Sequence, residues 1–327
     1  MIKATNLNKV FRTWVKEPGL RGSLRSFVRR SAVKRAAVRG FDLDIGQGEL
    51  VGLIGPNGAG KTTLMKMMTG IIVPTDGELS VLGYRPWERA RLFRKRIALV
   101  MGQKSQLWWD IPAMDSFLLL QKYYEIPVEK FRQRLDELTT VLQVGDQLNV
   151  HLRKLSLGER MKMELMGSLL HEPDVLFLDE PTIGLDLVSQ NNIRQFLGDY
   201  QRAHDTTIIL TSHYMADVHA LCERIVLILD GEKQFDGAID DFEGMLGREK
   251  FVAFRFANAV DRQDEIWREL DPVWTDDGLR VELKIPEDRL REITVGILQR
   301  FPVADFRTDK LPLERVMTDL MVVGKSP

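Results

Sequence analysis

The chain has 327 residues, which is too long for one small domain and suits a large domain followed by a smaller one. Lys and Arg number 46 against 47 Asp and Glu, so the net charge of −1 excludes a general attraction to nucleic acid. The single cysteine, Cys222, excludes a disulfide within the chain and suits a reducing compartment. With 44% hydrophobic residues, the chain can bury a full core.

No window approaches 18 uncharged apolar residues, so we expect no transmembrane helix. The first residues are of mixed polarity and contain no apolar signal segment. The sequence therefore predicts a protein that neither spans a membrane nor is exported by a signal peptide.

Residues 2–11 read as a strand that ends at Phe11. An aromatic residue here could stack on a nucleotide base or belong to the core, and its position alone does not decide between the two. Residues 12–39 then carry nine basic residues and one acid, Glu17. Apolar residues at helical spacing predict a short amphipathic basic helix, either as a solvated surface insertion or in contact with anionic lipid or a membrane partner.

Residues 41–54 predict strands around a turn at 46–48, and a glycine-rich loop follows them. The loop fits the spacing G-x-x-x-x-G-K-[ST] and predicts a phosphate cradle. Its glycines allow successive N–H groups to point at phosphate oxygens, and the next helix adds its positive end. Lys61 would reach the β- and γ-phosphates and Thr62 would bind Mg²⁺. The predicted ATP-binding residues here are Gly55, Pro56, Asn57, Gly58, Ala59, Gly60, Lys61, Thr62 and Thr63.

Two more strands are expected at 77–82 and 96–101, with Gln103 following the second. Residues 107–112 then read as a loop, and 114–170 carry helical periodicity as an insertion in an α/β pattern. Within it, Ser156 is a natural N-cap and Glu159 could complete a capping box.

The apolar run 175–178 predicts a buried strand that ends at Asp179 and Glu180, the edge where open α/β sheets hold their ligands. Beside a phosphate loop, Asp179 suits Mg²⁺ and Glu180 suits polarising the attacking water; alone, the pair could be a strand-terminal turn. A strand at 206–210 should lie beside this one. His213 follows it as a γ-phosphate contact, or else as a capping or buried histidine.

From about residue 246 the pattern changes to β-α-β-β-α-β, which predicts a small ferredoxin-like unit with helices at 262–270 and 287–300 and a closing helix at 313–321. We therefore divide the chain into a nucleotide-binding domain, 1–245, and a small α+β accessory domain, 246–327. A regulatory or dimerising role is our hypothesis for the second domain.

Four pieces occur in a fixed order: the phosphate loop, Gln103, the turn at 156–159 with Asp179 and Glu180 after it, and His213. Together, over residues 1–240, they resemble the ATP-binding-cassette (ABC) ATPases. The resemblance implies an α/β P-loop fold with a mixed sheet core, N-terminal antiparallel strands and a helical signature subdomain.

In that family two cassettes close head to tail around ATP. The resemblance implies that the signature turn contacts the γ-phosphate of the partner cassette, that Asp186 lies in the loop between the two sites, and that Gln103 touches Mg²⁺ and senses the transmembrane partner. The signature residues are Ser156, Leu157, Gly158 and Glu159.

Two features depart from the family pattern. The usual signature is L-S-G-G-Q, whereas Leu157 and Glu159 replace a glycine and the glutamine here. Phe11 stands where tyrosine is common, and the basic insertion separates it from the phosphate loop by more than usual.

The basic insertion, the Gln-Leu-Trp-Trp stretch and the C-terminal extension look most like ATPase subunits of ABC-2-type exporters. We therefore expect an ATP-hydrolysing, Mg²⁺-dependent subunit that acts as a homodimer on separate transmembrane permease subunits, at the cytoplasmic face of the membrane. The alternatives are a soluble ABC ATPase acting on nucleic acid or ribosomes, which the near-neutral charge disfavours, and a phosphate-loop kinase or GTPase, which would leave the signature turn unexplained.

Overall fold

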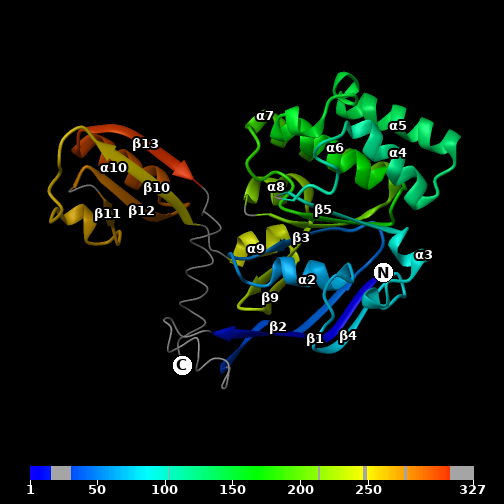
Figure 1. Cartoon of the computed structure of the whole chain (residues 1–327). Helices are drawn as coiled ribbons and strands as arrows, with labels where there is room; N and C mark the ends of the chain where they lie inside the picture. The colour runs from blue at the N-terminus through cyan, green and yellow to red at the C-terminus, as the bar shows by residue number, and fades with distance from the viewer. Residues whose placement is uncertain (16–30, 103, 213, 246–248, 276–277, 310–327) are drawn as a thin grey trace, which may run out of the picture. The chain divides into compact units, whose positions relative to one another are not determined.

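The computed structural model describes residues 1–15, 31–102, 104–212, 214–245, 249–275 and 278–309. The chain divides into two compact units, Met1–Gly237 and Ala238–Pro327 (Figure 1). The boundary predicted from the sequence falls later, after residue 245. Among the described residues, no helix combines the length and the apolar character needed to cross a bilayer.

The core of the first unit is a six-stranded sheet in the order β5-β6-β7-β3-β8-β9. Neighbouring strands from β5 to β8 are parallel and nearly fully buried, as expected for uninterrupted apolar runs. The predicted neighbourhood of the Asp179 strand and the 206–210 strand is confirmed, because β6 pairs with β7. The strands are β3 (Leu50–Ile54), β5 (Ile97–Met101), β6 (Val175–Asp179), β7 (Thr207–Thr211), β8 (Arg224–Leu229) and β9 (Glu232–Ala238).

A second, antiparallel sheet has the order β2-β1-β4, and helix α2 (Lys61–Met68) packs between the two sheets (Figure 1). Leu64, Met67 and Met68 of α2 share one buried cluster with residues of both sheets. This packing fixes the helix that follows the phosphate loop. The strands are β1 (Ile2–Val15), β2 (Ser31–Ile45) and β4 (Asp76–Val81).

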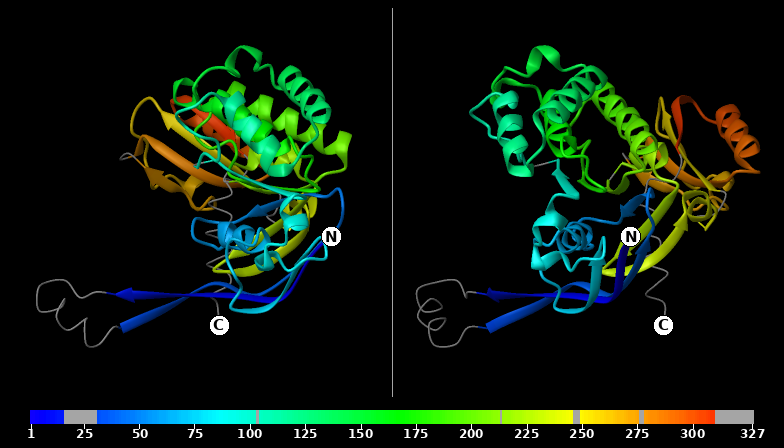
Figure 2. Two further views of the ribbon diagram at one scale, coloured as in Figure 1. Left: turned by 45° about the vertical axis from the view of Figure 1, so that its right-hand side comes forward. Right: turned by 90° about the vertical axis from the view of Figure 1, so that its right-hand side faces the viewer.

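The strand predicted to end at Phe11 is longer in the structure. Residues 12–15 continue β1 and residues 31–39 belong to β2, so both flanks form one long hairpin whose far end extends from the rest of the unit (Figure 2). β-Branched residues such as Val10 and Val33 suit paired strands. The amphipathic helix expected at residues 20–28 lies outside the described residues.

Helices also form where the sequence predicted a helical insertion. They are α4 (Ala113–Tyr124), α5 (Val128–Leu142) and α6 (Leu157–Leu169), which lie together in Figure 1. Pro112 and Pro127 stand at the N-caps of α4 and α5, where a missing N–H costs nothing. The remaining helices of this unit are α3 (Arg91–Arg94), α7 (Leu187–His204) and α8 (Met215–Leu221), with 3-10 helices η1 (Pro86–Glu88), η2 (Gly145–Gln147) and η3 (Leu152–Lys154).

The second unit contains a four-stranded antiparallel sheet in the order β11-β12-β10-β13, which is the strand order of the predicted split β-α-β unit. The helix predicted at 262–270 is wrong, because only the short η4 (Glu265–Trp267) forms there. Asp261 and Asp264 side chains accept from nearby backbone N–H groups, and Trp267 packs into the aromatic core. The closing helix expected at 313–321 lies outside the described residues. The other elements are α9 (Ile239–Met245), β10 (Glu249–Phe256), β11 (Val273–Thr275), β12 (Arg280–Pro286), α10 (Leu290–Arg300) and β13 (Val303–Asp309).

Candidate active site

The phosphate loop joins buried strand β3 to helix α2, and its glycines have left-handed backbone angles. Gly55 has φ +153°, and a Cβ there would lie 2.2 Å from the Ile228 carbonyl oxygen. Gly60 has φ +114°, and its Cβ would lie 2.4 Å from the carbonyl oxygen of Ala37. Any larger residue would strain or displace this loop.

Lys61, the first residue of α2, is 5% exposed and folds back over the loop. Its Nζ donates to the carbonyl oxygens of Gly55 (2.6 Å) and Pro56 (3.1 Å). Burial lowers the Lys61 pKa, while the nearby carboxylates of Glu180 and Asp179 oppose that shift. None of the described side chains caps the start of α2, so its first N–H groups remain available to an anion.

Asp179, at the end of β6, lies against this loop. Thr62 Oγ1 donates to its two carboxylate oxygens at 3.1 and 3.0 Å, and Thr211 Oγ1 donates to Oδ1 at 2.7 Å. Glu180 follows in a left-handed conformation, φ +56°, and its N–H donates to the Thr211 carbonyl oxygen at 3.0 Å. A non-glycine residue held at positive φ marks a place where the surrounding structure fixes the backbone.

The strands on either side of β6 lead toward Gln103 and His213, which both lie outside the described residues. Their neighbours can be placed. Gly102 donates its N–H to the Asp179 carbonyl oxygen at 2.8 Å, and a Cβ on Gly102 would lie 2.0 Å from the Glu180 carbonyl oxygen. Position 102 therefore has room only for glycine while Glu180 keeps its place.

A buried carboxylate, Asp217 of α8, ties these strand ends together. It is 0% exposed and accepts from Thr182 Oγ1 (2.5 Å), Ser212 Oγ (2.5 Å) and Arg194 Nε (2.6 Å). Thr182 comes two residues after Glu180, and Ser212 ends the segment after β7. Asp217 thus connects both sides of the site, a role that no sequence spacing indicated.

The turn at 156–159 forms the predicted capping box, which is confirmed. Ser156 Oγ accepts from the Glu159 N–H at 3.3 Å, and Glu159 Oε2 accepts from the Ser156 N–H at 2.9 Å. The Ser156 N–H and the Ser156 hydroxyl, which donates to Glu159 Oε2 at 2.8 Å, stabilise the carboxylate and lower the pKa of Glu159. The Glu159 side chain therefore caps the N-terminus of its own helix, α6.

Ser189, which no sequence pattern indicated, is bonded to Asp186 and lies beside this turn. Asp186 caps α7 by accepting from the Ser189 N–H (2.9 Å) and Oγ (2.6 Å). A Cβ on Gly158 would lie 2.6 Å from the same Ser189 Oγ, and a Cβ on Gly184 would lie 3.2 Å from Cδ2 of Leu157. The structure thus brings Asp186, Leu157 and Gly158 together within one chain.

Helix α6, which follows the signature turn, holds the loop after Gln103 through its residue Glu164. The Glu164 side chain is 6% exposed. Its carboxylate accepts from Ser105 Oγ at 2.5 Å and from the Gln106 N–H at 3.1 Å. Burial raises the pKa of Glu164 in spite of these bonds. Arg160, one turn earlier, stacks over the exposed ring of Trp109. No sequence pattern predicted that this loop is bonded to α6.

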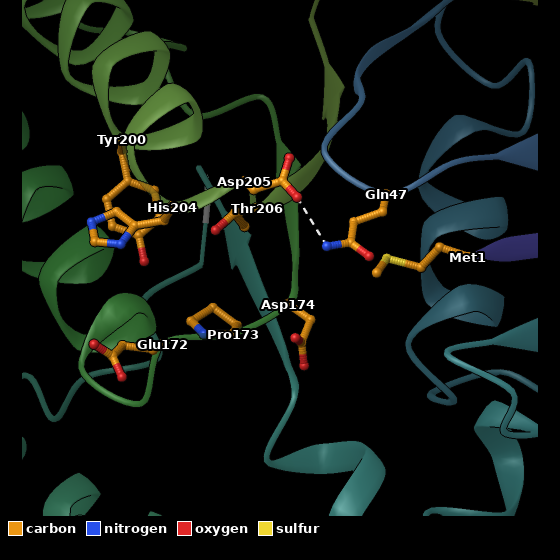
Figure 3. Close-up of a pocket in the computed structure, with 9 residues that line it drawn as sticks. All are labelled: Met1, Gln47, Glu172, Pro173, Asp174, Tyr200, His204, Asp205 and Thr206. Atoms are coloured by element: carbon orange, nitrogen blue, oxygen red, sulfur yellow. Dashed lines mark hydrogen bonds between the residues drawn. The ribbon is translucent and has the colours of Figure 1, made fainter.

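Phe11 lies on β1 directly opposite Arg35 of β2 and is 36% exposed. Its ring therefore remains accessible, and Lys9 Nζ lies 5.2 Å from the ring centroid. A separate polar pocket lies at the other end of the parallel strands, where Gln47 Nε2 donates to Asp205 Oδ2 at 2.9 Å (Figure 3). The pocket lies at the start of β6 and β7, whereas Asp179 is the last residue of β6. The pocket and Asp179 are therefore at opposite ends of that strand.

Comparison with known proteins identifies the family. A family model described as ABC transporter matches residues 38–183. The ABC transporter ATP-binding protein NatA of Bacillus subtilis (strain 168) is 32% identical over 204 residues, covering 62% of this chain and 82% of NatA. The Nod factor export ATP-binding protein I of Rhizobium sp. (strain N33) is 32% identical over 211 residues, 64% of this chain and 69% of that protein.

A third relative, the daunorubicin resistance ATP-binding protein DrrA3 of Streptomyces coeruleorubidus, is 29% identical over 290 residues, 87% of this chain and 89% of DrrA3. Among solved structures, the dimeric MJ0796 ABC transporter cassette has a TM-score of 0.60 at 23% identity, covering 73% of this chain and 99% of that one. Its post-hydrolysis state with ADP and Pi has a TM-score of 0.61 at 23% identity and the same coverage. The predicted α/β P-loop cassette fold is therefore confirmed, and the chain belongs to the ATP-binding proteins of ABC transporters, which hydrolyse ATP.

Proposed function

We propose that the residues around the phosphate loop bind and hydrolyse Mg·ATP in assigned roles. The backbone of 55–63 and Lys61 hold the phosphates, Thr62 and Asp179 hold Mg²⁺, and Glu180 polarises the attacking water. The family resemblance assigns Gln103 to Mg²⁺. His213 is assigned to the γ-phosphate because it follows β7, and Phe11 to the base.

The observation that carries this assignment is the contact of Thr62 with Asp179, which joins the start of α2 to the end of β6. A hydroxyl and a carboxylate on one side of a phosphate cradle are ligands that suit Mg²⁺, which is usually held by one or two carboxylates together with substrate phosphates. When bound, Mg²⁺ would neutralise phosphate charge.

The chain's own groups divide the remaining work. Lys61, already buried, brings a positive charge to the phosphates without a further desolvation cost. Glu180 stands one residue beyond Asp179 on a backbone that is hydrogen-bonded to Thr211, and its carboxylate would accept a proton from water.

The same proposal places a second copy of the chain across the site. Ser156 and Gly158 of each copy would contact the γ-phosphate held by the other, with Asp186 between the two sites. The dimeric state of the MJ0796 cassette supports this arrangement. In this proposal the Ser156 hydroxyl, which donates to Glu159 Oε2 at 2.8 Å within its own chain, would turn to the γ-phosphate of the other copy.

We further propose that the dimer acts on separate permease subunits, as an exporter of the ABC-2 type, at the cytoplasmic face of the membrane. The support is the naming of relatives for Nod factor export and daunorubicin resistance. Trp108 and Trp109, about half exposed beside α6, offer an apolar contact for such a partner.

Replacing Glu180 tests the proposal. Because Glu180 acts on water and not on binding, Glu180→Gln should retain ATP binding, lower turnover by roughly a hundred-fold or more and accumulate a dimer in ATP. Turnover and gel filtration with ATP measure both effects. Glu223→Gln, an exposed carboxylate, is the matched control. Ordinary turnover by Glu180→Gln would remove Glu180 from the mechanism.

A further inference from the structure

We propose that Arg35, on strand β2, supplies a second cation to the phosphates of the bound nucleotide, in addition to Lys61. The proposal rests on the nucleotide site described above and adds a binding residue to it. Arg35 belongs to the basic stretch of the sequence, for which the assigned reaction has no other use.

Backbone contacts first fix β2 against the phosphate loop. The Arg39 N–H donates to the Gly231 carbonyl oxygen at 2.8 Å, and the Gly231 N–H donates to the Ala59 carbonyl oxygen at 2.9 Å. The Ala37 carbonyl oxygen packs against Gly60, where a Cβ would lie 2.4 Å away. β2 therefore reaches the loop directly, at Ala37, and through Gly231.

The Arg35 side chain then reaches the middle of the loop. Its Nη2 lies 3.4 Å from the position that a Cβ on Gly58 would take. Gly58 has φ +82° and lies among the residues whose N–H groups would face the phosphates of a bound nucleotide. A planar guanidinium matches two phosphate oxygens at once, so a short movement would place it on the β-phosphate.

The strand register separates Arg35 from its basic neighbours. Arg35 pairs with Phe11, and the next pair is Lys34 with Arg12. Because directly opposite residues share a face and successive residues alternate, Arg35 and Phe11 project together, while Lys34 and Arg12 project to the other face. A base stacked on Phe11 would carry its phosphates past Arg35.

This alternation provides a matched control. Lys34→Ala removes the same charge, one residue away, from the opposite face. We expect Arg35→Ala to raise the dissociation constants of ATP and ADP about ten-fold, the effect of one charge-assisted hydrogen bond, and to flatten their salt dependence. AMP, which lacks the β-phosphate, should bind as before, and Lys34→Ala should bind all three nucleotides normally.

The measurement is displacement of a fluorescent ADP analogue from the full chain, with thermal unfolding to check folding and Lys61→Ala as a reference. Equal affinities of Arg35→Ala and Lys34→Ala for ATP would overturn the proposal, as would an equal loss of AMP binding. If Lys61→Ala weakens ATP binding while Arg35→Ala does not, Arg35 alone is wrongly assigned. If neither substitution weakens ATP binding, the phosphate cradle itself is wrongly assigned.

Discussion

At the scale of single residues, the geometry of Glu180 depends on its backbone neighbours. Its φ of +56° is held by a hydrogen bond to Thr211 and by close packing against Gly102. Sequence spacing could indicate Lys61, Thr62 and Asp179, because the phosphate-loop motif and a strand-end acid are local patterns. It could not indicate Thr211, Gly102 or Asp217, because strand pairing alone brings these residues to the site.

Gly102→Ala tests that dependence. An added Cβ 2.0 Å from the Glu180 carbonyl oxygen must displace backbone, and a shift of about 1 Å at a reacting group costs roughly a hundred-fold in rate. We expect hydrolysis to fall by at least about ten-fold while ATP binding changes little. The control is Gly145→Ala, where the nearest atom lies at 3.7 Å. Unchanged turnover in a folded Gly102→Ala variant would show that Glu180 tolerates displacement.

At the scale of elements, the start of helix α6 is fixed by charge as well as by hydrogen bonds. The Ser156 N–H and hydroxyl both stabilise the ionised Glu159 carboxylate, which lowers its pKa. A carboxylate with a lowered pKa contributes stability above its unfolded-state pKa of about 4.3 and loses it as the pH falls through the folded pKa.

Glu159→Gln should therefore reduce the free energy of unfolding near neutral pH and become equivalent to the native chain in acid. Urea unfolding between roughly pH 3 and 7 measures the difference, which should shrink below about pH 5. A difference that stays constant over this range would mean that the glutamate charge does not support the helix start.

Other elements show where the hydrophobic pattern of the sequence is enough to predict the secondary structure. Strands β6 and β7 were predicted from continuous apolar runs, and the helical insertion from its 3.6-residue spacing. The hairpin of β1 and β2 was not predicted, because its basic outer strands resemble a polar insertion and the pairing of the two strands with each other is not visible in either segment alone. The 262–270 segment kept helical spacing but formed only η4, since tertiary packing of Trp267 outweighed local propensity.

At the scale of the whole molecule, the central claim concerns two copies of the chain. The first unit carries both the phosphate loop and the signature turn, and the turn's position beside Asp186 and Ser189 is built within one chain. Neither composition nor spacing could indicate contacts across a dimer, so this part of the site came from family resemblance alone.

A structure of the Glu180→Gln variant with Mg·ATP tests this claim most directly, because that variant should hold the nucleotide without turning it over. We expect a head-to-tail dimer in which Ser156 Oγ and the Gly158 N–H of one copy lie within about 3 Å of the γ-phosphate held by the loop of the other. A nucleotide-saturated monomer, or a dimer with both residues remote from every phosphate, would contradict it.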